Sequence, residues 1–439
     1  MKARFRKLLS DFGETFWLVP AAVVIAGILL ALGLVHMDRR GAVPQWLIAS
    51  PWLYSGGGTG ARTLLGAVAS STIGVAGTVF SITIAALSLA AGQMGPRLLR
   101  NFTRDRGNQM SLGIFLGTFS YALMVLRSVR TQSEGEFVPH LSLSVGILLA
   151  FVCVGTLVYF VHHIAGRINV DTVIELVGAE VGQAIAGLTQ ETPGDEPPPE
   201  TAWREATAIR DKRRGYLQQI DAAGLADWAH GHGTSVRLLV RPGDYVFPGG
   251  PIALVQPGVE GADAAIFDAT ALGQSRASSQ DLEFAVRQLV EVAVRALSPG
   301  INDPNTAIGV LDNLGAALCD LAPRHLPTGV TRREDRTVLF VPAVDYAGLV
   351  DAMFHMIRQN GAGSPAVLIR LIEVLTAVAN VERSPVRLPA LQRHADLALA
   401  DAERALSASD LGDVRMRHVE FTSMRESGRP KQIREATRG

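Results

Sequence analysis

The chain has 439 residues, and its 41 basic side chains balance its 41 acidic ones. This balance, with no long basic block, gives no support to nucleic-acid binding, and two cysteines are too few for a disulfide framework or a cysteine-rich zinc site. Hydrophobic residues make up 48% of the chain, which is high for a soluble protein, and the excess lies almost entirely before residue 166.

Four apolar segments in that region are long enough to cross a bilayer as helices. They cover about residues 16–35, 63–92, 110–129 and 141–164. Basic residues precede the first span and follow the second, which places those segments in the cytoplasm. Because the number of spans is even, both termini are then cytoplasmic. The sequence therefore predicts a transmembrane domain, residues 1–166, in contact with the lipid bilayer.

The second of these spans carries a seam of small side chains. Its positions alternate in spacing between three and four residues, so they lie along one side of the helix. In lipid, such a face lets helices approach closely and hydrogen-bond to each other, which is its commoner use. The alternative is that the face lines a narrow wet path. The seam consists of Ser71, Gly74, Thr78, Ser81, Ala85, Ser88 and Gly92.

The composition becomes more polar after residue 166. Residues 167–277 are predicted to hold an amphipathic helix, an acidic proline-rich loop at 192–200 and a small β-module. In that module the stretch SVRLLVRPGDYVFPGGPIALVQP (235–257) alternates strands and turns. This form is similar to the β-sandwich of biotinyl and lipoyl carrier domains. Because no lysine stands at the tight turn, a structural or docking role is favoured. Residues 278–426 are predicted to be mainly helical, and 427–439 to form a basic tail.

The segment SPGINDPNTAIGVLD contains the most distinctive motif of this second half. Asp303 suits the N-cap of a helix and Pro304 its first position, so the simpler interpretation is a well-capped corner. The alternative is a ligand corner, where free N–H groups bind an anion or side-chain oxygens hold a cation. The ligand corner would consist of Ser298, Asn302, Asp303, Asn305 and Thr306.

Familiar catalytic motifs are missing from the sequence. It has no phosphate-cradling loop, no zinc-protease motif and no nucleophile elbow. We therefore expect no enzyme activity, no cofactor and no metal site. A catalytic group could still form in space, for example from Asp303 with His230 or His355, and spacing along the chain does not test this.

Four segments together resemble one bacterial family. They are GTVFSITIAALSLAAGQMGPRLLRNFTRDRGNQ, FVPHLSLSVGILL, RPGDYVFPGGPIALV and SPGINDPNTAIGVLD. The family is that of the inner-membrane proteins called domain of unknown function 2254. The resemblance covers nearly the whole chain and implies a bacterial inner-membrane protein with a cytosolic C-terminal half, but it carries no activity and no catalytic residues.

These observations predict an α-helical integral membrane domain with four transmembrane helices, plus an α+β cytosolic domain made of a small β-module and a helical bundle. The favoured function is a homo-oligomeric, channel-like pore for ions or small solutes, gated by the cytosolic domain. The seam would line the path, and Phe80 or Ile84 would form a dewetting gate. The alternative is a membrane-anchored sensor or scaffold that binds a cytosolic ligand or partner, with the seam packing the bundle.

Overall fold

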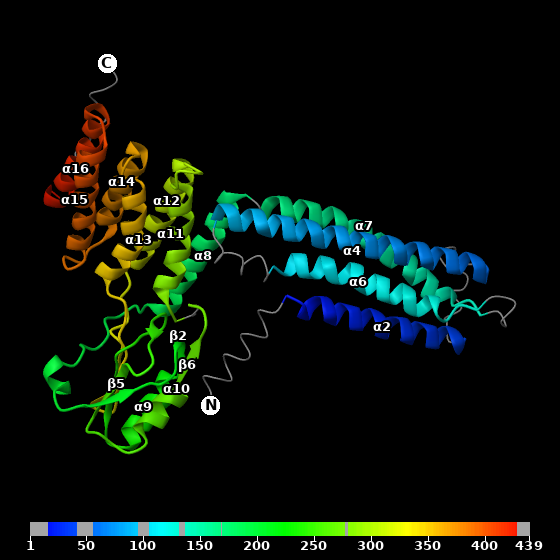
Figure 1. Cartoon of the computed structure of the whole chain (residues 1–439), viewed down its shortest axis with the longest axis horizontal. Coiled ribbons are helices and arrows are strands. Elements are labelled where there is room, and N and C mark those ends of the chain that lie inside the picture. The colour runs from blue at the N-terminus through cyan, green and yellow to red at the C-terminus, as the bar shows by residue number, and fades with distance from the viewer. Residues whose placement is uncertain are drawn as a thin grey trace. The chain divides into compact units, whose positions relative to one another are not determined.

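The computed structural model describes residues 16–41, 56–94, 105–130, 137–167, 169–276 and 280–427. These residues form two compact units (Figure 1). The membrane unit is drawn from Ser10–Gly92 and Pro96–Asn169, and the C-terminal unit is drawn mainly from Val170–Gly439. The basic N-terminus, most of the basic loop after the second span and the tail from residue 428 lie outside the described residues.

The membrane unit consists of four long apolar helices, as predicted. They are α2 (Leu18–Arg39), α4 (Gly58–Met94), α6 (Arg106–Leu126) and α7 (His140–Arg167). Each is long and apolar enough to cross a bilayer. At 37 residues, α4 is roughly 55 Å long and exceeds a hydrocarbon core of about 30 Å. The predicted four-span fold is confirmed, and α4 is even longer than expected.

Small residues bring α2 and α6 into close contact. A Cβ atom placed on Gly27 of α2 would lie 2.6 Å from the carbonyl oxygen of Gly117 on α6. One placed on Gly113, one turn before Gly117, would lie 3.2 Å from the Cα of Pro20. Gly113 and Gly117 therefore form a GxxxG contact, in which two backbones approach without side chains between them.

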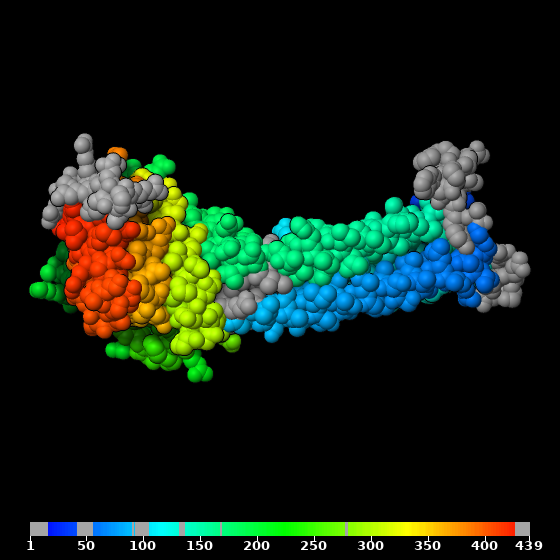
Figure 2. Space-filling view, turned by 90° about the horizontal axis from the view of Figure 1, so that it is seen from above, coloured from blue at the N-terminus to red at the C-terminus, as the bar shows by residue number. Residues whose placement is uncertain are grey.

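The other face of the bundle is closed by α4 and α7, which run side by side in Figures 1 and 2. Val79 of α4 is buried in one apolar cluster with Phe115 of α6 and Phe160 of α7. The start of α7 is fixed by α2, because the Asp38 carboxylate accepts hydrogen bonds from the backbone N–H groups of Leu141 (3.1 Å) and Ser142 (3.0 Å). These contacts satisfy donors that have no partner within α7 itself.

The C-terminal unit begins with α8 (Val170–Leu188) and continues into a β-module. One sheet has the strand order β1-β5-β3-β8-β7, and the other has the order β4-β2-β6. Helices α9 (Ala222–Gly231) and α10 (Ala262–Ala269) pack with the sheets around a shared apolar core. The strands are β1 (Thr207–Arg210), β2 (Gly215–Ile220), β3 (Ser235–Leu238), β4 (Tyr245–Val246), β5 (Pro251–Gln256), β6 (Thr270–Gly273), β7 (Val330–Arg333) and β8 (Arg336–Phe340).

The module is not confined to one stretch of sequence. Strand β3 pairs in parallel with β8, about a hundred residues further along the chain, with Val236 opposite Leu339. The long connection between these two strands contains α11 (Leu282–Ala296) and α12 (Pro304–Leu321). Such a pairing has no local signal, because it depends on a crossover that brings distant segments together.

The remaining helices of the C-terminal unit pack as neighbouring layers. Helix α8 contacts α11 and α12, α12 contacts α14, and α14 contacts α15 and α16. Figure 2 shows α12, α14 and α16 as adjacent bands from yellow-green through orange to red. Together with the two small sheets, they form the mixed α/β region that the sequence predicted. The helices are α11 (Leu282–Ala296), α12 (Pro304–Leu321), α13 (Tyr346–Asn360), α14 (Pro365–Val381), α15 (Leu388–Ala405) and α16 (Ala408–Ser427).

Candidate functional site

Most of the small-residue seam of α4 faces away from the rest of its own bundle, whereas Ser71 at its start lines a pocket with Phe115 of α6 and Cys153 of α7. Ser71, Thr78 and Ala85 are exposed, and each is followed directly by a residue that is buried or half-buried. One residue corresponds to a rotation of about 100° around the helix, so the packed face lies beside the seam. All seven seam residues are exposed in the single chain. A Cβ atom added at Gly74 or Gly92 would meet no other atom within 4 Å.

Hydroxyl groups of the seam bond to the helix that carries them. Thr78 Oγ1 donates to the carbonyl oxygen of Gly74 (3.1 Å), and Ser81 Oγ donates to that of Gly77 (2.9 Å). Their protons are thereby satisfied, as is usual for serine and threonine in membrane helices. The oxygen lone pairs are what these two side chains present outward.

The candidate gate residues lie beside the seam and differ in their surroundings. Phe80 is partly exposed, and its ring centroid lies 6.4 Å from that of Trp17, next to the start of α2. Ile84, about one turn further along α4, is 48% exposed. Both side chains are large and apolar, which is what a dewetting constriction requires.

The predicted corner around Asp303 forms a capped helix start. The Asp303 carboxylate accepts from the N–H groups of Asn305 (3.1 Å) and Thr306 (3.2 Å) and from the Thr306 hydroxyl (2.6 Å). Pro304 is the first residue of α12, as expected. The Ser298 hydroxyl donates to the carbonyl oxygen of Arg295 (2.6 Å), and Asn302 takes the left-handed conformation at φ 51°. The five residues are close together, and the cap uses the oxygens of Asp303. The ligand corner stays a prediction.

A polar cluster joins α13 and α15. Asp351 and His355 are one turn apart on α13, and the Nε2 atom of His394 on α15 lies 2.8 Å from an oxygen of Asp351. One carboxylate oxygen of Asp351 and one ring nitrogen of each histidine all lie within 4.8 Å of one another, a spacing that would allow them to hold a metal ion. However, Arg393 donates to Asp351 (2.9 Å) and places a second nitrogen 3.0 Å from His355. The guanidinium therefore already supplies the positive charge there. His355 joins this cluster, whereas Asp303 is used by the α12 cap.

Burial has a clear effect on one member of this cluster. His394 is fully buried, and burial is the main reason why its pKa falls to about 4, although the Asp351 carboxylate opposes that change. Among the residues that the structure describes, none bonds the Nδ1 atom of His394. The residue is therefore neutral at neutral pH and acts as a packed element between α13 and α15.

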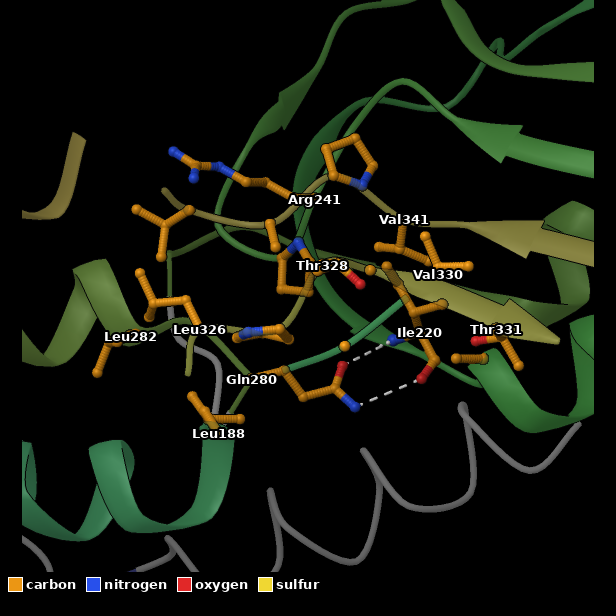
Figure 3. Close-up of a pocket in the computed structure, with 18 of the residues that line it drawn as sticks. Leu188, Ile220, Arg241, Gln280, Leu282, Leu326, Thr328, Val330, Thr331 and Val341 are labelled. Carbon is orange, nitrogen blue, oxygen red and sulfur yellow. Dashed lines mark hydrogen bonds between the residues drawn. The ribbon is translucent and has the colours of Figure 1, made fainter. Parts of the chain in front are cut away.

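A cavity of about 490 Å³ lies inside the C-terminal unit (Figure 3). Its walls come from the end of α8, the end of β2, the turn after β3, the start of α11 and the segments 326–331 and 341–344. Apolar side chains such as Leu188, Leu326 and Val341 line the walls together with polar ones such as Asp195 and Thr328. This size and lining are typical of sites for small organic molecules.

Two polar side chains of the cavity, Gln280 and Arg241, already have partners in the chain. Gln280 accepts from the N–H of Ile220 (3.1 Å) and donates to the carbonyl oxygen of the same residue (3.4 Å), as the dashed lines in Figure 3 show. Arg241 donates to Glu283 (2.7 Å). The sequence did not indicate this cavity, because its wall residues are spread from 187 to 344.

Comparisons with known proteins place the chain in a family. Residues 13–377 match the family described as "Predicted membrane protein (DUF2254)". The chain is 32% identical over 414 residues to an uncharacterized protein of Mycobacterium tuberculosis strain CDC 1551, MT1328, and to one of Mycobacterium bovis, Mb1321c. Each alignment covers 91% of this chain and 78% of the relative. No solved structure matches the chain. By both the family match and its relatives, the chain belongs to the DUF2254 family of predicted membrane proteins.

Proposed function

We propose that this protein is a homo-oligomeric, channel-like pore of the bacterial inner membrane, with both termini in the cytoplasm. The α4 seam of each copy would face a common axis and form the path for ions or small solutes. The observation that carries the proposal is the exposure of all seven seam residues on a helix that crosses the membrane. In this proposal the protein is not an enzyme and uses no cofactor.

A path inside a single copy is the weaker alternative. Large side chains fill the described centre of the bundle, where Phe115, Tyr121 and Phe160 are almost completely buried. Four helices leave little space around such a core. A ring of copies, most simply a symmetric one, provides an axis without opening the bundle.

The chemistry of the seam favours cations over anions. Because the protons of Thr78 and Ser81 are directed to their own helix, these side chains offer oxygen lone pairs to whatever lies opposite. Oxygen atoms of this kind can replace part of the hydration shell of a cation. The exposed side chain of Ile84 would supply the apolar constriction of the closed state.

Ion flux into liposomes tests this proposal directly. Purified full-length protein is compared with Thr78→Leu and Ser81→Leu, and Thr156→Leu serves as the matched control. Thr156 lies on α7 and not on α4, is half-buried, and has the same type of hydroxyl bond, 2.8 Å to Val152. The proposal expects flux in the parent and in Thr156→Leu, and loss of flux in the two seam variants at unchanged oligomer size. Absence of flux in the parent under varied salt, pH and membrane tension refutes it.

A second function is supported by the cavity in the C-terminal unit. In this alternative the protein is a membrane-anchored sensor, and a small apolar molecule binds in the 490 Å³ cavity. Thr328→Trp would fill part of the cavity and abolish the thermal stabilisation that a binding compound gives to the full-length protein. A compound that stabilises both forms equally would argue against the cavity as its site.

A further inference from the structure

Exposed aromatic side chains gather at one end of the β-module. Strand β4 alternates, so that Val246 points into the core while Tyr245 and Phe247 point outward. Phe247 is 69% exposed. Tyr216 lies opposite Tyr245 in the strand register. The ring centroids of Tyr216 and Tyr245 are 5.1 Å apart, and those of Tyr245 and Phe247 are 4.9 Å apart.

A basic segment that directly precedes β2 is bound to the turn that follows these rings. The segment 210–214 is bound to the turn after β4 through Asp211, whose N–H donates to the carbonyl oxygen of Gly250 (3.1 Å) and whose carbonyl oxygen accepts from Gly249 (2.6 Å). Arg210 also donates to the carbonyl oxygen of Gly249 (2.8 Å). The two segments thus form one surface. We call it the aromatic–basic tip; it consists of Arg210, Lys212, Arg214, Tyr216, Tyr245 and Phe247.

The charge of the tip is positive and available. Arg210, Lys212 and Arg214 are exposed, and Lys212 and Arg214 make no ion pair with any residue that the structure describes. The one acidic residue of this segment, Asp211, is buried and paired with Arg213 (2.7 Å). Because that acid is removed from the surface, the segment presents three cations on the same surface as the rings.

Aromatic rings beside lysine and arginine suit the interface of a membrane with anionic lipids. The rings insert at headgroup depth, and the cations are attracted to the negative surface potential. The chain itself carries the membrane spans, so a bilayer is always within reach at high effective concentration. Two copies of a cationic tip would repel each other, which disfavours self-association through this surface.

We propose that the aromatic–basic tip docks onto the anionic headgroup surface of the bilayer. The fraction of docked β-module would then depend on the lipid composition, because each basic side chain strengthens the contact only where anionic lipid is present. The inference stands whether or not α4 conducts.

Quenching by brominated lipid tests the docking. Full-length Phe247→Trp is placed in nanodiscs of phosphatidylcholine alone, or of phosphatidylcholine mixed with phosphatidylglycerol, with brominated acyl chains in both. The fluorescence of the parent is subtracted to remove its own tryptophans. The matched control is Val386→Trp, at a position 85% exposed between α14 and α15. Quenching is expected for Phe247→Trp in the anionic nanodiscs and not for the control.

Removing charge gives the decisive comparison. In the Phe247→Trp background, Lys212→Gln or Arg214→Gln should each lower the ratio of docked to undocked tip about fivefold. Salt near 1 M should have a similar effect, because the Debye length is then about 3 Å and the attraction between the cations and the lipid is screened. These side chains are exposed, so the variants should fold. Quenching that is equal in both lipid mixtures, or equal to the control, overturns the proposal. Protection of the new indole from an aqueous quencher without lipid quenching also overturns it, because the indole is then buried against protein and not in the bilayer.

Discussion

Substituting Gly27 by alanine should force α2 and α6 apart. The new Cβ would lie 2.6 Å from the carbonyl oxygen of Gly117, and its nearest neighbours are backbone atoms that have no rotamer to change. The two helices would have to separate by about 0.8 Å, which is the difference between 2.6 Å and an ordinary contact of 3.4 Å. A gap of this size removes a quarter to a half of the dispersion energy of the contacts along the interface.

The free energy of unfolding should fall by a measurable amount. Overpacking of this kind costs about 1–3 kcal/mol, and the better helix propensity of alanine returns up to about 1 kcal/mol. We therefore expect a net loss of about 1–2 kcal/mol for Gly27→Ala. The measurement is equilibrium unfolding of the full-length protein in mixed micelles with increasing dodecyl sulfate.

Gly33→Ala is the control on the same helix. A Cβ at Gly33 would meet nothing within 4 Å, so only the gain in helix propensity applies, and stability should stay equal or rise slightly. If both variants unfold at the same denaturant concentration, the close approach of α2 to α6 does not stabilise the bundle, and the reasoning is refuted.

Three further outcomes are expected. Asp38→Ala should destabilise the start of α7 by about 1–3 kcal/mol, because three hydrogen-bond donors lose the carboxylate that accepts from them. The hydrogen-exchange rates of the first α7 amides should rise, and Asp38→Asn should raise them less. Asp303→Ala should lower stability by about 1 kcal/mol through loss of the α12 cap, and Asp303→Asn should retain most of it; equal urea midpoints for the two variants would contradict this. For His394, the folded-state pKa of about 4 lies below the ordinary 6.5, so the unfolded chain binds the proton first. The free energy of unfolding should therefore decrease as pH falls from about 6.5 to 4, by about 3 kcal/mol in total. The measurement is hydrogen exchange of the α15 amides, corrected for intrinsic rates, and its dependence on pH should be weaker in His394→Gln than in the parent.

Much of the fold follows from local sequence. The four spans are recognised because apolar runs of sufficient length need no information from elsewhere in the chain. The cap of α12 is equally local, since Asp303 bonds groups only two and three residues away. Helix α14, within the region predicted to be mainly helical, is local for the same reason: its apolar period and its first-position proline, Pro365, lie within the segment.

Only the tertiary structure decides which faces meet. The sequence draws attention to the α4 seam, but the close glycine contact is between Gly27 and Gly117, on helices that are far apart in the chain. A GxxxG spacing at Gly113 and Gly117 was present in the sequence, and nothing local says which helix lies against it. The seam is left exposed in the single chain because another face of α4, with Ala76, Val79 and Ala86, is the one that packs on α6 and α7.

The same limit applies to the candidate sites. Asp351 and His394 are 43 positions apart, yet their side chains bond directly, and the segment at 211–214 joins the turn at 247–250 through backbone hydrogen bonds. Hydrophobic period and capping act over a few residues, and they determined the helices, the strands and the membrane character of this protein. Contacts between distant segments depend on how every element packs at once, and that packing decided where the cavity, the polar cluster and the aromatic–basic tip would form.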